Sequence, residues 1–288
     1  MRGAKKELKI VIFFTSLILV VEVIGGIISN SLALLSDAVH VFSDVFALTL
    51  SFFALSLAAR PPSTSRTFGF HRAEVFAALI NGVTLFIISF FIFKKSYERI
   101  LMPPDIKTTE MLTVAVFGFF VNLWVIHRLK GHGDDLNIRS AFLHVLGDAL
   151  ASLGVIIGAV IIILTGNTIV DPIISVLIGI IIVFGSLRVI KESLHILLEG
   201  TPRHIDPKKV SNAILGVDGV KNVHDLHIWS ICSHINAASA HIIVGDVMMS
   251  HVNQISKSVE KEMDAQGIGH TTFQFECGEE EPCDIDHE

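Results

Sequence analysis

Residues 140–164 read SAFLHVLGDALASLGVIIGAVIIIL, and they decide the class of the fold. The stretch carries no titratable side chain other than His144 and Asp148. A helix of about 20 mostly apolar residues spans the hydrocarbon core of a bilayer. Burying an imidazole and a carboxylate there is costly, so both are expected to face a partner, a cavity or a functional site. The stretch therefore predicts a membrane-spanning helix that carries a polar site.

Five other stretches share this apolar character, at residues 10–28, 32–59, 73–93, 111–126 and 169–190. The chain of 288 residues is 51% hydrophobic and 17% charged, with a mean hydropathy of +0.63. In soluble domains about a quarter of the residues are charged, so this composition favours a membrane protein. Together the stretches predict an α-helical bundle of six transmembrane helices, with both termini on the same side of the membrane.

Basic residues in the short loops indicate which side that is. The first nine residues carry four Lys or Arg, loops 60–72 and 127–139 carry three each, and the loops at 29–31 and 165–168 carry none. Because basic loops stay in the cytoplasm, both termini are expected there. The third loop also holds four basic residues, from Lys94 to Lys107. We expect the third helix to continue past the membrane and to end at Pro103 and Pro104.

The composition changes after residue 199. Residues 200–288 carry 6 Lys and Arg against 14 Asp and Glu, a net charge of −8, whereas the preceding residues have a net charge of +2. Helical patterns at 206–215 and 250–266 and β-rich stretches at 220–231, 235–244 and 270–276 predict the order α-β-β-α-β. We therefore expect a membrane domain at 1–199 and a cytosolic α+β domain at 200–288, with helices on one face of the sheet and an acidic tail. The acidity argues against a nucleic-acid partner and suits a domain that attracts cations.

The pair in HVLGD at 144–148 has a counterpart in the second apolar stretch, HVFSD at 40–44. Each pair places His at position i and Asp at i+4, an advance of about 400° around a helix, so both side chains share a face. Two imidazoles and two carboxylates form a four-coordinate set that zinc favours. The predicted intramembrane metal ligands are His40, Asp44, His144 and Asp148. Asp37 falls on much the same side of the second helix, and three roles are open for it: a proton relay, a partner that orients His40, or a packing residue.

The two pairs lie in the second and fifth of six helices, which indicates a repeat of three helices with the site at their interface. A buried His can instead serve only as a hydrogen-bonding group between helices. The other stretches contain the lone polar residues Glu22, Asn81, Asn122 and Asp171. These are interpreted as helix-packing groups, and Asp171 can instead mark the start of its helix.

The second part of the chain contains eight of the fourteen histidines. His224 and His227 lie three residues apart on the first predicted strand and are expected to point to opposite faces. Imidazole, carboxylate and thiolate groups all bind zinc, and a metal site that includes His224 and His241 is predicted. Further ligand types near the end of the chain are His270, Glu276, Cys277 and Cys283. Strand histidines and acidic tails can otherwise simply be solvated.

Three classes of function place metal ligands inside a membrane. A secondary active exporter uses a closed site, whereas an intramembrane metal-dependent hydrolase needs an open coordination position and a general base. No H-E-x-x-H motif supplies that base, and no G-x-x-x-x-G-K-[ST] loop indicates use of ATP. A passive divalent cation channel favours weak, multiple sites. The exporter is the favoured hypothesis, with the hydrolase and the channel as alternatives.

The chain resembles the cation diffusion facilitators, a family of zinc-efflux transporters, over essentially its whole length. The resemblance is carried by SLALLSDAVHVFSD at 31–44, RTFGFHRAE at 66–74, HVLGD at 144–148, VHDLHIWSI at 223–231 and SAH at 239–241. It implies a homodimer in the lipid bilayer that exchanges Zn²⁺ for protons through the four intramembrane ligands. It also implies a metallochaperone-like cytosolic domain that binds and senses zinc. The matching positions there are His224, His241, His270 and Glu276.

The resemblance bears on several further positions. Some family members have an accessory metal site in the second loop, but Arg66 and Phe70 stand at two of its positions here, and His71 follows one residue later. Arg72 matches a residue that pairs with an acid at the end of the sixth helix, which is Glu199 here. A His as first ligand is associated with zinc over cadmium, although Co²⁺, Cd²⁺, Fe²⁺ and Ni²⁺ use overlapping ligands. The loop after the fourth helix lacks the long His-rich insert of many eukaryotic relatives, so a bacterial inner membrane is expected.

Overall fold

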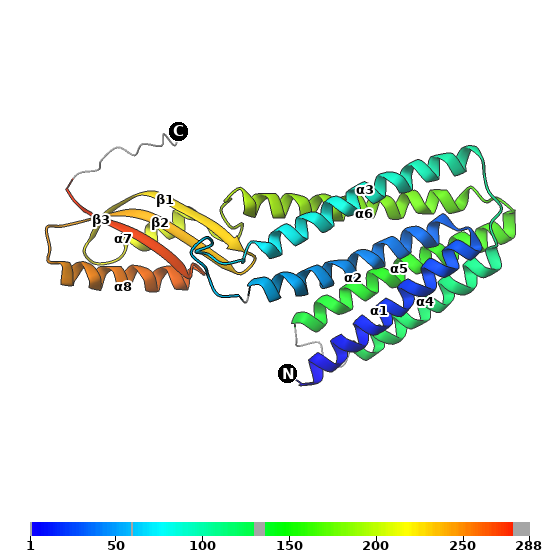
Figure 1. Ribbon diagram of the computed structural model, residues 1–288, viewed down its shortest axis with the longest axis horizontal. Coiled ribbons are helices and arrows are strands. Elements are labelled where there is room, and N and C mark those ends of the chain that lie inside the picture. The colour runs from blue at the N-terminus through cyan, green and yellow to red at the C-terminus, as the bar shows by residue number, and fades with distance from the viewer. Residues whose placement is uncertain (1, 59, 130–135, 279–288) are drawn as a thin grey trace. The chain divides into compact units, whose positions relative to one another are not determined.

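The computed structural model describes residues 2–58, 60–129 and 136–278, with side chains described except at 2–11, 48, 51–52, 54–55, 58, 136–141 and 144. Six long helices come first: α1 (Arg2–Ser29), α2 (Leu32–Ala58), α3 (Ala73–Leu101), α4 (Thr108–Leu129), α5 (Leu136–Thr165) and α6 (Val170–Leu197). They are followed by α7 (Pro207–Leu215), β1 (Val220–Cys232), β2 (Ile235–Val244), α8 (Met249–Ala265) and β3 (His270–Cys277) (Figure 1).

The chain divides into two compact units. The first comprises Met1–Phe52 and Ile80–Ile190, and the second comprises Phe53–Leu79 and Lys191–Glu288. The second unit therefore contains the α+β domain together with the end of α2, the loop between α2 and α3, the first turns of α3 and about the last two turns of α6.

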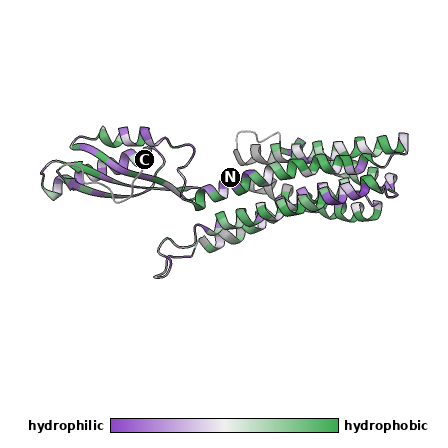
Figure 2. Ribbon diagram, turned by 90° about the horizontal axis from the view of Figure 1, so that it is seen from above, coloured by the Kyte–Doolittle hydropathy of each residue, from purple (hydrophilic) through white to green (hydrophobic). Residues whose placement is uncertain are grey.

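Hydrophobic residues predominate along the described parts of the helices of the first unit, as Figure 2 shows. Within the described residues, α1, α3, α4, α5 and α6 are long and apolar enough to cross a membrane. Large apolar side chains are exposed on them, such as Phe90 at 68% and Phe184 at 71%, which in a helix that is apolar all round indicates contact with lipid. By length and composition, five helices of the described residues therefore agree with the predicted spans. α2, several of whose side chains are not described, is not among the five, so the sixth span stays a prediction.

Small residues let the helices of this unit approach closely. A Cβ added to Gly82 of α3 would lie only 3.3 Å from the carbonyl oxygen of Ser186 and 3.0 Å from Ile190 Cγ1 on α6. This close approach places α3 and α6 side by side (Figure 1). A shared apolar core joins five helices, with buried members such as Leu34, Leu85 and Met111.

Asp171, near the start of α6, caps a different helix. Its fully buried carboxylate accepts hydrogen bonds from Ser31 Oγ at 2.5 Å and from the amides of Leu32 at 2.8 Å and Ala33 at 3.1 Å. These are amides at the start of α2, which no carbonyl of that helix can satisfy. Asp171 is thus neither a simple packing residue nor only the start of its own helix.

The same carboxylate compensates a cation at the end of α3. Arg99 Nη1 lies 3.6 Å from Asp171 Oδ2, and the guanidinium donates to the carbonyl and side-chain oxygens of Asn30 at 2.7 and 2.9 Å. Part of the basic charge of the third loop is therefore held in a structural ion pair. α3 runs to Leu101, which agrees with the expected extension toward Pro103 and Pro104.

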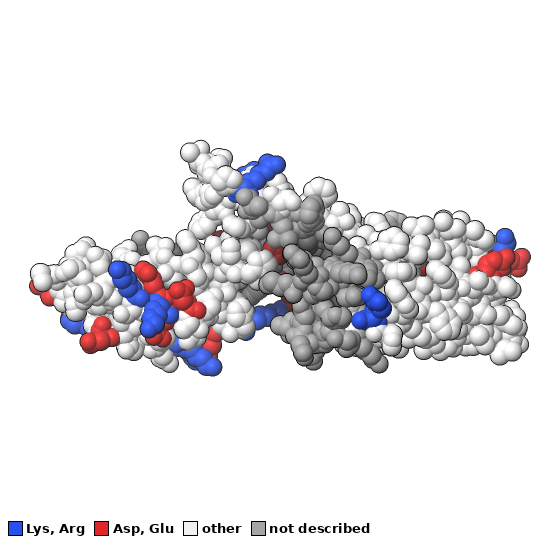
Figure 3. All heavy atoms as spheres, turned by 90° about the horizontal axis from the view of Figure 1, so that it is seen from below, with Lys and Arg blue, Asp and Glu red and all other residues white. Residues whose placement is uncertain are grey.

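The α+β domain of the second unit contains a three-stranded sheet in the order β1-β2-β3. β1 and β2 are antiparallel and joined by a two-residue turn, whereas β3 runs parallel to β2 after the crossover helix α8. The two helices pack on one apolar core with the strands, through Val210 and Ile214 of α7 and Val259 and Met263 of α8. This matches the expected α-β-β-α-β order. On the face seen in Figure 3, charged side chains gather over this domain.

One expectation about β1 is wrong. His224 pairs with His241 and His227 pairs with Ser239, so β1 advances three residues while β2 advances two. The extra residue is a β-bulge, and Asp225 within it has a φ of 51°, in the left-handed region that Asp tolerates. His224 and His227 consequently face the same side of the sheet, although their spacing predicts opposite faces in a regular strand.

Candidate metal sites

Three of the four predicted intramembrane ligands lie together. His40 and Asp44 on α2 and Asp148 on α5 each place one ligand atom within 4.8 Å of the other two. His40 Nε2 is 3.9 Å from Asp148 Oδ1, and the side chain of Asp148 is only 4% exposed. The side chain of His144 lies outside those described; its position on α5 is one helical turn before Asp148. One imidazole and two carboxylates brought together in an apolar bundle are a ligand set that suits a divalent cation.

Two further buried acids surround this group. Asp37 on α2 and Glu22 on α1 are 1% and 2% exposed, and each interacts electrostatically with Asp148. Within the described residues, no hydrogen-bond partner reaches Asp37 Oδ1 or Glu22 Oε2. The interpretation of Glu22 as a lone packing residue is therefore wrong. No spacing rule within the sequence links α1 to the pairs on α2 and α5, so sequence reasoning had no signal for it.

A second group lies on the sheet of the α+β domain. His224 on β1 and His241 on β2 are cross-strand partners with ring centroids 5.0 Å apart. Glu276 on β3 joins them, with Oε2 3.1 Å from His224 Nε2 and Oε1 2.8 Å from His241 Nδ1. The hydrogen bond with His224 lowers the pKa of the Glu276 carboxyl below its usual value, so the group is ionised at neutral pH. The three side chains offer two nitrogen ligands and one oxygen ligand to a metal.

Asp225 extends this group through the bulge in β1. Its Oδ1 lies 2.8 Å from His227 Nε2, and its Oδ2 lies 3.9 Å from His241 Nε2. Sequence reasoning missed Asp225 because a regular strand would turn its side chain to the opposite face from His224.

Other predicted ligands of this domain do not join the group. His270 begins β3, six residues from Glu276, which is about 20 Å along a strand, and its ring lies 5.6 Å from that of Phe68. Cys277 is exposed, and its thiol lies 3.4 Å from the carbonyl oxygen of Gly245. Cys283 lies outside the described residues.

The second loop lines a cavity of about 790 Å³ beside β1 and β2. His71 lies in its wall, and within the described part of the chain it belongs to no group of three metal-binding side chains. The guanidinium of Arg66 stacks on Phe70, 4.4 Å from the ring centroid.

Arg72 and Glu199 form an ion pair within the second unit. Arg72 Nη2 lies 2.9 Å from Glu199 Oε1, with side chains 38% and 63% exposed. Arg72 directly precedes α3, and Glu199 follows α6 with a φ of 61°. The pair thus links the start of α3 to the end of α6, and its exposure limits its contribution to stability to about 1 kcal/mol or less.

Comparisons with known proteins agree with this arrangement. A family profile described as the cation efflux transmembrane domain matches residues 8–198, and one described as the cation efflux protein cytoplasmic domain matches residues 202–276. The chain is 42% identical to the cadmium, cobalt and zinc/H⁺-K⁺ antiporter of Bacillus subtilis strain 168, over 95% of this chain and 90% of that protein. It is 38% identical to the metal cation efflux system protein CzcD of Cupriavidus metallidurans, over 98% of this chain and 89% of that protein.

A solved structure of the metal-bound C-terminal domain of the CzcD transporter is also similar, with 30% identity, a TM-score of 0.23, and coverage of 25% of this chain and 99% of that one. The two family profiles together span nearly the whole chain, and the relatives match it from end to end. The chain therefore belongs to the cation efflux family, the cation diffusion facilitators, which are membrane transporters and not enzymes.

Proposed function

We propose that this divalent-metal exporter carries Zn²⁺ out of the cytoplasm in exchange for protons. The observation that supports it most is the convergence of three ligand atoms, from His40, Asp44 and Asp148, within 4.8 Å of one another in an apolar helical bundle. His144, at the matching offset on α5, is the fourth ligand of the transported ion. The B. subtilis relative is named as an antiporter of cadmium, cobalt and zinc with H⁺ and K⁺, which supports both the substrate class and the exchange.

The chemistry of the ligands supports proton coupling. An imidazole or carboxylate must lose its proton before it binds a metal, so metal and protons compete for the same atoms. When the site faces the cytoplasm, it binds Zn²⁺ and releases protons. When it faces a more acidic compartment, protons displace the ion. Alternation of the site between the two sides of the membrane then exports the metal.

The donor set favours zinc among the divalent metals. Two nitrogens and two oxygens in a four-coordinate arrangement suit Zn²⁺. Co²⁺ and Cd²⁺ are expected as further substrates, since the names of relatives include both. Fe²⁺ and Ni²⁺ use overlapping ligands.

The group on the sheet fits a resident regulatory Zn²⁺. His224, His241 and Glu276 present two imidazoles and an ionised carboxylate within 4.8 Å, which are ordinary zinc ligands. The ion would supply positive charge between the three strands there. We further propose that this domain mediates a homodimer and senses cytosolic zinc, as the family resemblance implies.

The proposed organisation is a six-span membrane domain at 1–199 and a cytosolic metal-binding domain at 200–288, in a bacterial inner membrane with both termini in the cytoplasm. The boundary between the two matched family profiles, after residue 198, supports this division. The basic loops at 60–72 and 127–139 support the orientation.

Replacing Asp148 by Ala tests the transport site. In proteoliposomes that contain a zinc indicator and a pH dye, the wild type is expected to move Zn²⁺ and protons in opposite directions. Asp148→Ala removes a buried ligand and should abolish both signals. Asp246→Ala, at an exposed carboxylate of the α+β domain, should leave both unchanged.

The outcomes separate the hypotheses. Zinc loading by Asp148→Ala at the wild-type rate would show that the transport ligands are misassigned. Zinc flux by the wild type without any proton signal would favour the passive channel over the antiporter.

A further inference from the structure

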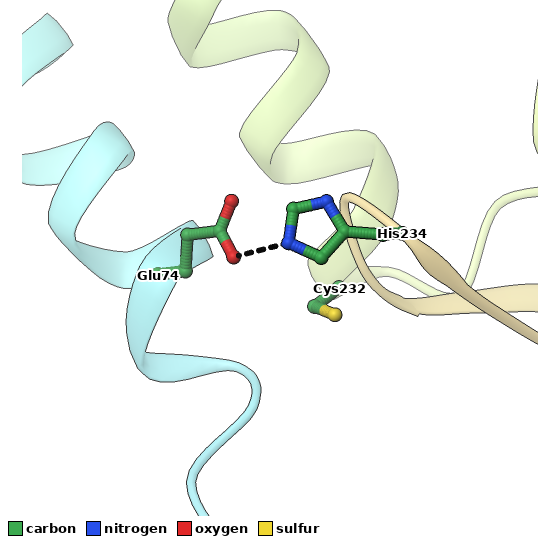
Figure 4. Close-up of side chains that lie close together, drawn as sticks. All are labelled: Glu74, Cys232 and His234. Atoms are coloured by element: carbon green, nitrogen blue, oxygen red, sulfur yellow. Dashed lines mark ion pairs between the residues drawn. The ribbon is translucent and has the colours of Figure 1, made fainter. Parts of the chain in front are cut away.

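A third group of metal-binding side chains lies within the second unit, separate from the two sites above. Its members are Glu74 in the first turn of α3, Cys232 at the end of β1, and His234 in the turn between β1 and β2. Each places one ligand atom within 4.8 Å of the other two. Figure 4 shows the Glu74 carboxylate and the His234 imidazole facing each other, with Cys232 beside them. We propose that Glu74, Cys232 and His234 form a further Zn²⁺ site.

The distances between the ligand atoms of this group are close to those of a zinc site. In a tetrahedral zinc site with bonds of about 2.0–2.3 Å, neighbouring ligand atoms are about 3.3–3.8 Å apart. Glu74 Oε2 and His234 Nε2 are already 3.3 Å apart. The thiol of Cys232 lies within 4.8 Å of one ligand atom of each of these two side chains, so small side-chain movements complete three corners of the tetrahedron.

The local structure holds two of these ligands in place. β1 ends at Cys232 and β2 begins at Ile235, so the hairpin turn consists of Ser233 and His234 and fixes His234 two residues from the thiol. Ser233 Oγ donates a hydrogen bond of 2.9 Å to Glu74 Oε1. This hydrogen bond engages Oε1 of the carboxylate, while Oε2 is directed at His234. Hydrogen bonds of this kind orient carboxylate ligands in metal sites.

The chemistry of the group differs from that of the other two sites. Cys232 adds a thiolate, which makes the set one sulfur, one nitrogen and one oxygen, all common zinc ligands, with a fourth position for water. Cys232 is 2% exposed, whereas the side chains of Glu74 and His234 are 21% and 65% exposed. An ion can therefore enter from solvent through the imidazole side while the sulfur is shielded. A cysteine that serves only apolar packing has no need of an acid and an imidazole at its thiol.

A bound ion would join the first turn of α3 to the β1–β2 turn. Glu74 and Ser233 are 159 residues apart in sequence, and a hydrogen bond joins their side chains, while an ion pair joins Glu74 to His234. Zn²⁺ would strengthen this connection, so the site makes the anchoring of α3 depend on metal concentration.

The test uses Co²⁺ as a spectroscopic substitute for Zn²⁺ in the full-length protein in detergent. The chain has three cysteines, and Cys277→Ser with Cys283→Ser leaves Cys232 as the only thiol. Cobalt bound by a thiolate shows a sulfur-to-metal charge-transfer band in the near ultraviolet, which nitrogen and oxygen ligands do not produce. Co²⁺ added in excess of the capacity of the other two sites should generate this band in the double variant, and Zn²⁺ should abolish it.

Single substitutions in that background identify the ligands. Cys232→Ser should remove the band, and Glu74→Gln and His234→Ala should each weaken Co²⁺ binding by about tenfold or more. His251→Ala and Glu260→Gln, at exposed residues of α8, are matched controls and should change nothing. Asp148→Ala should retain the band, which makes the result independent of the transport site.

Two outcomes would overturn the proposal. One is the absence of a charge-transfer band in the variant whose only thiol is Cys232. The other is a band whose Co²⁺ affinity is unaffected by both Glu74→Gln and His234→Ala, since the thiol alone then binds the metal. Glu74 and His234 have exposed surface, so these two variants remain informative if Cys232→Ser fails to fold.

Discussion

Asp171 connects the start of its own helix α6 to the start of α2 and the end of α3. Its buried carboxylate accepts hydrogen bonds from two backbone amides at the start of α2 and from the Ser31 hydroxyl. It also forms an ion pair with the guanidinium of Arg99. Removing one partner of a buried charged network leaves the other without compensation, which costs about 3–5 kcal/mol. We therefore expect Asp171→Ala to unfold at a clearly lower temperature than the wild type, with both proteins purified in detergent.

A double substitution distinguishes charge compensation from general damage. Arg99→Met combined with Asp171→Ala removes both charges and should recover part of the lost stability. Asp105→Ala, at an exposed carboxylate near the end of α3, should melt like the wild type. An unchanged unfolding temperature for Asp171→Ala would show that the hydrogen bonds of this carboxylate are dispensable.

Single residues also show where sequence reasoning succeeds. The i, i+4 spacing of His40 and Asp44 predicted a shared helix face, and the structure places both beside Asp148. Glu22 was not predicted, because its relation to Asp37 and Asp148 depends on how α1 packs on α2 and α5 and not on any local period. Local periodicity therefore predicts side chains on one element, while contacts between elements require the tertiary structure.

Among the elements, β1 has the most consequential irregularity. Asp225 holds the left-handed conformation of the bulge that turns His224 and His227 to the same side. A β-branched residue is strained at positive φ, whereas glycine adopts it freely. Asp225→Val should lower the free energy of unfolding by about 1–3 kcal/mol, and Asp225→Gly should lower this free energy less.

The comparison of the two Asp225 variants separates backbone strain from the loss of the hydrogen bond to His227. The stability of each variant is measured by circular dichroism during heating of the full-length protein. Equal destabilisation by glycine and valine would assign the whole effect to the side chain and none to the bulge.

The order of the elements was predictable, but this bulge was not. The length of the apolar stretches indicated the long helices, and local residue patterns indicated the α-β-β-α-β order. The Asp206–Pro207 pair marked the start of α7, where the structure shows the Asp206 cap. A bulge changes the register of a strand without changing the residue types on either side of it. The same limit applies to the third group, since no sequence spacing connects Glu74 with Cys232 and His234.

In the whole molecule, the proposed transport and sensing ligands occupy two contrasting environments. His40, Asp44 and Asp148 lie in an apolar bundle, where unbalanced charge is costly and a site can release its ion only when protons replace it. His224, His241 and Glu276 lie on the sheet of an acidic domain, where water and neighbouring carboxylates tolerate either the free or the bound state. The first arrangement suits transport and the second suits sensing.

The buried location of the transport ligands predicts that the pH gradient drives export. In inside-out membrane vesicles with an acidic lumen, the cytoplasmic face is exposed to the medium, and protons from the lumen should displace Zn²⁺ from the imidazoles and carboxylates after it has crossed. Collapsing the gradient with a protonophore should reduce uptake of radioactive zinc to the level of Asp148→Ala. Asp246→Ala should respond like the wild type. Zinc uptake that persists unchanged after the gradient is collapsed would contradict proton coupling, because a passive pathway responds only to the zinc gradient.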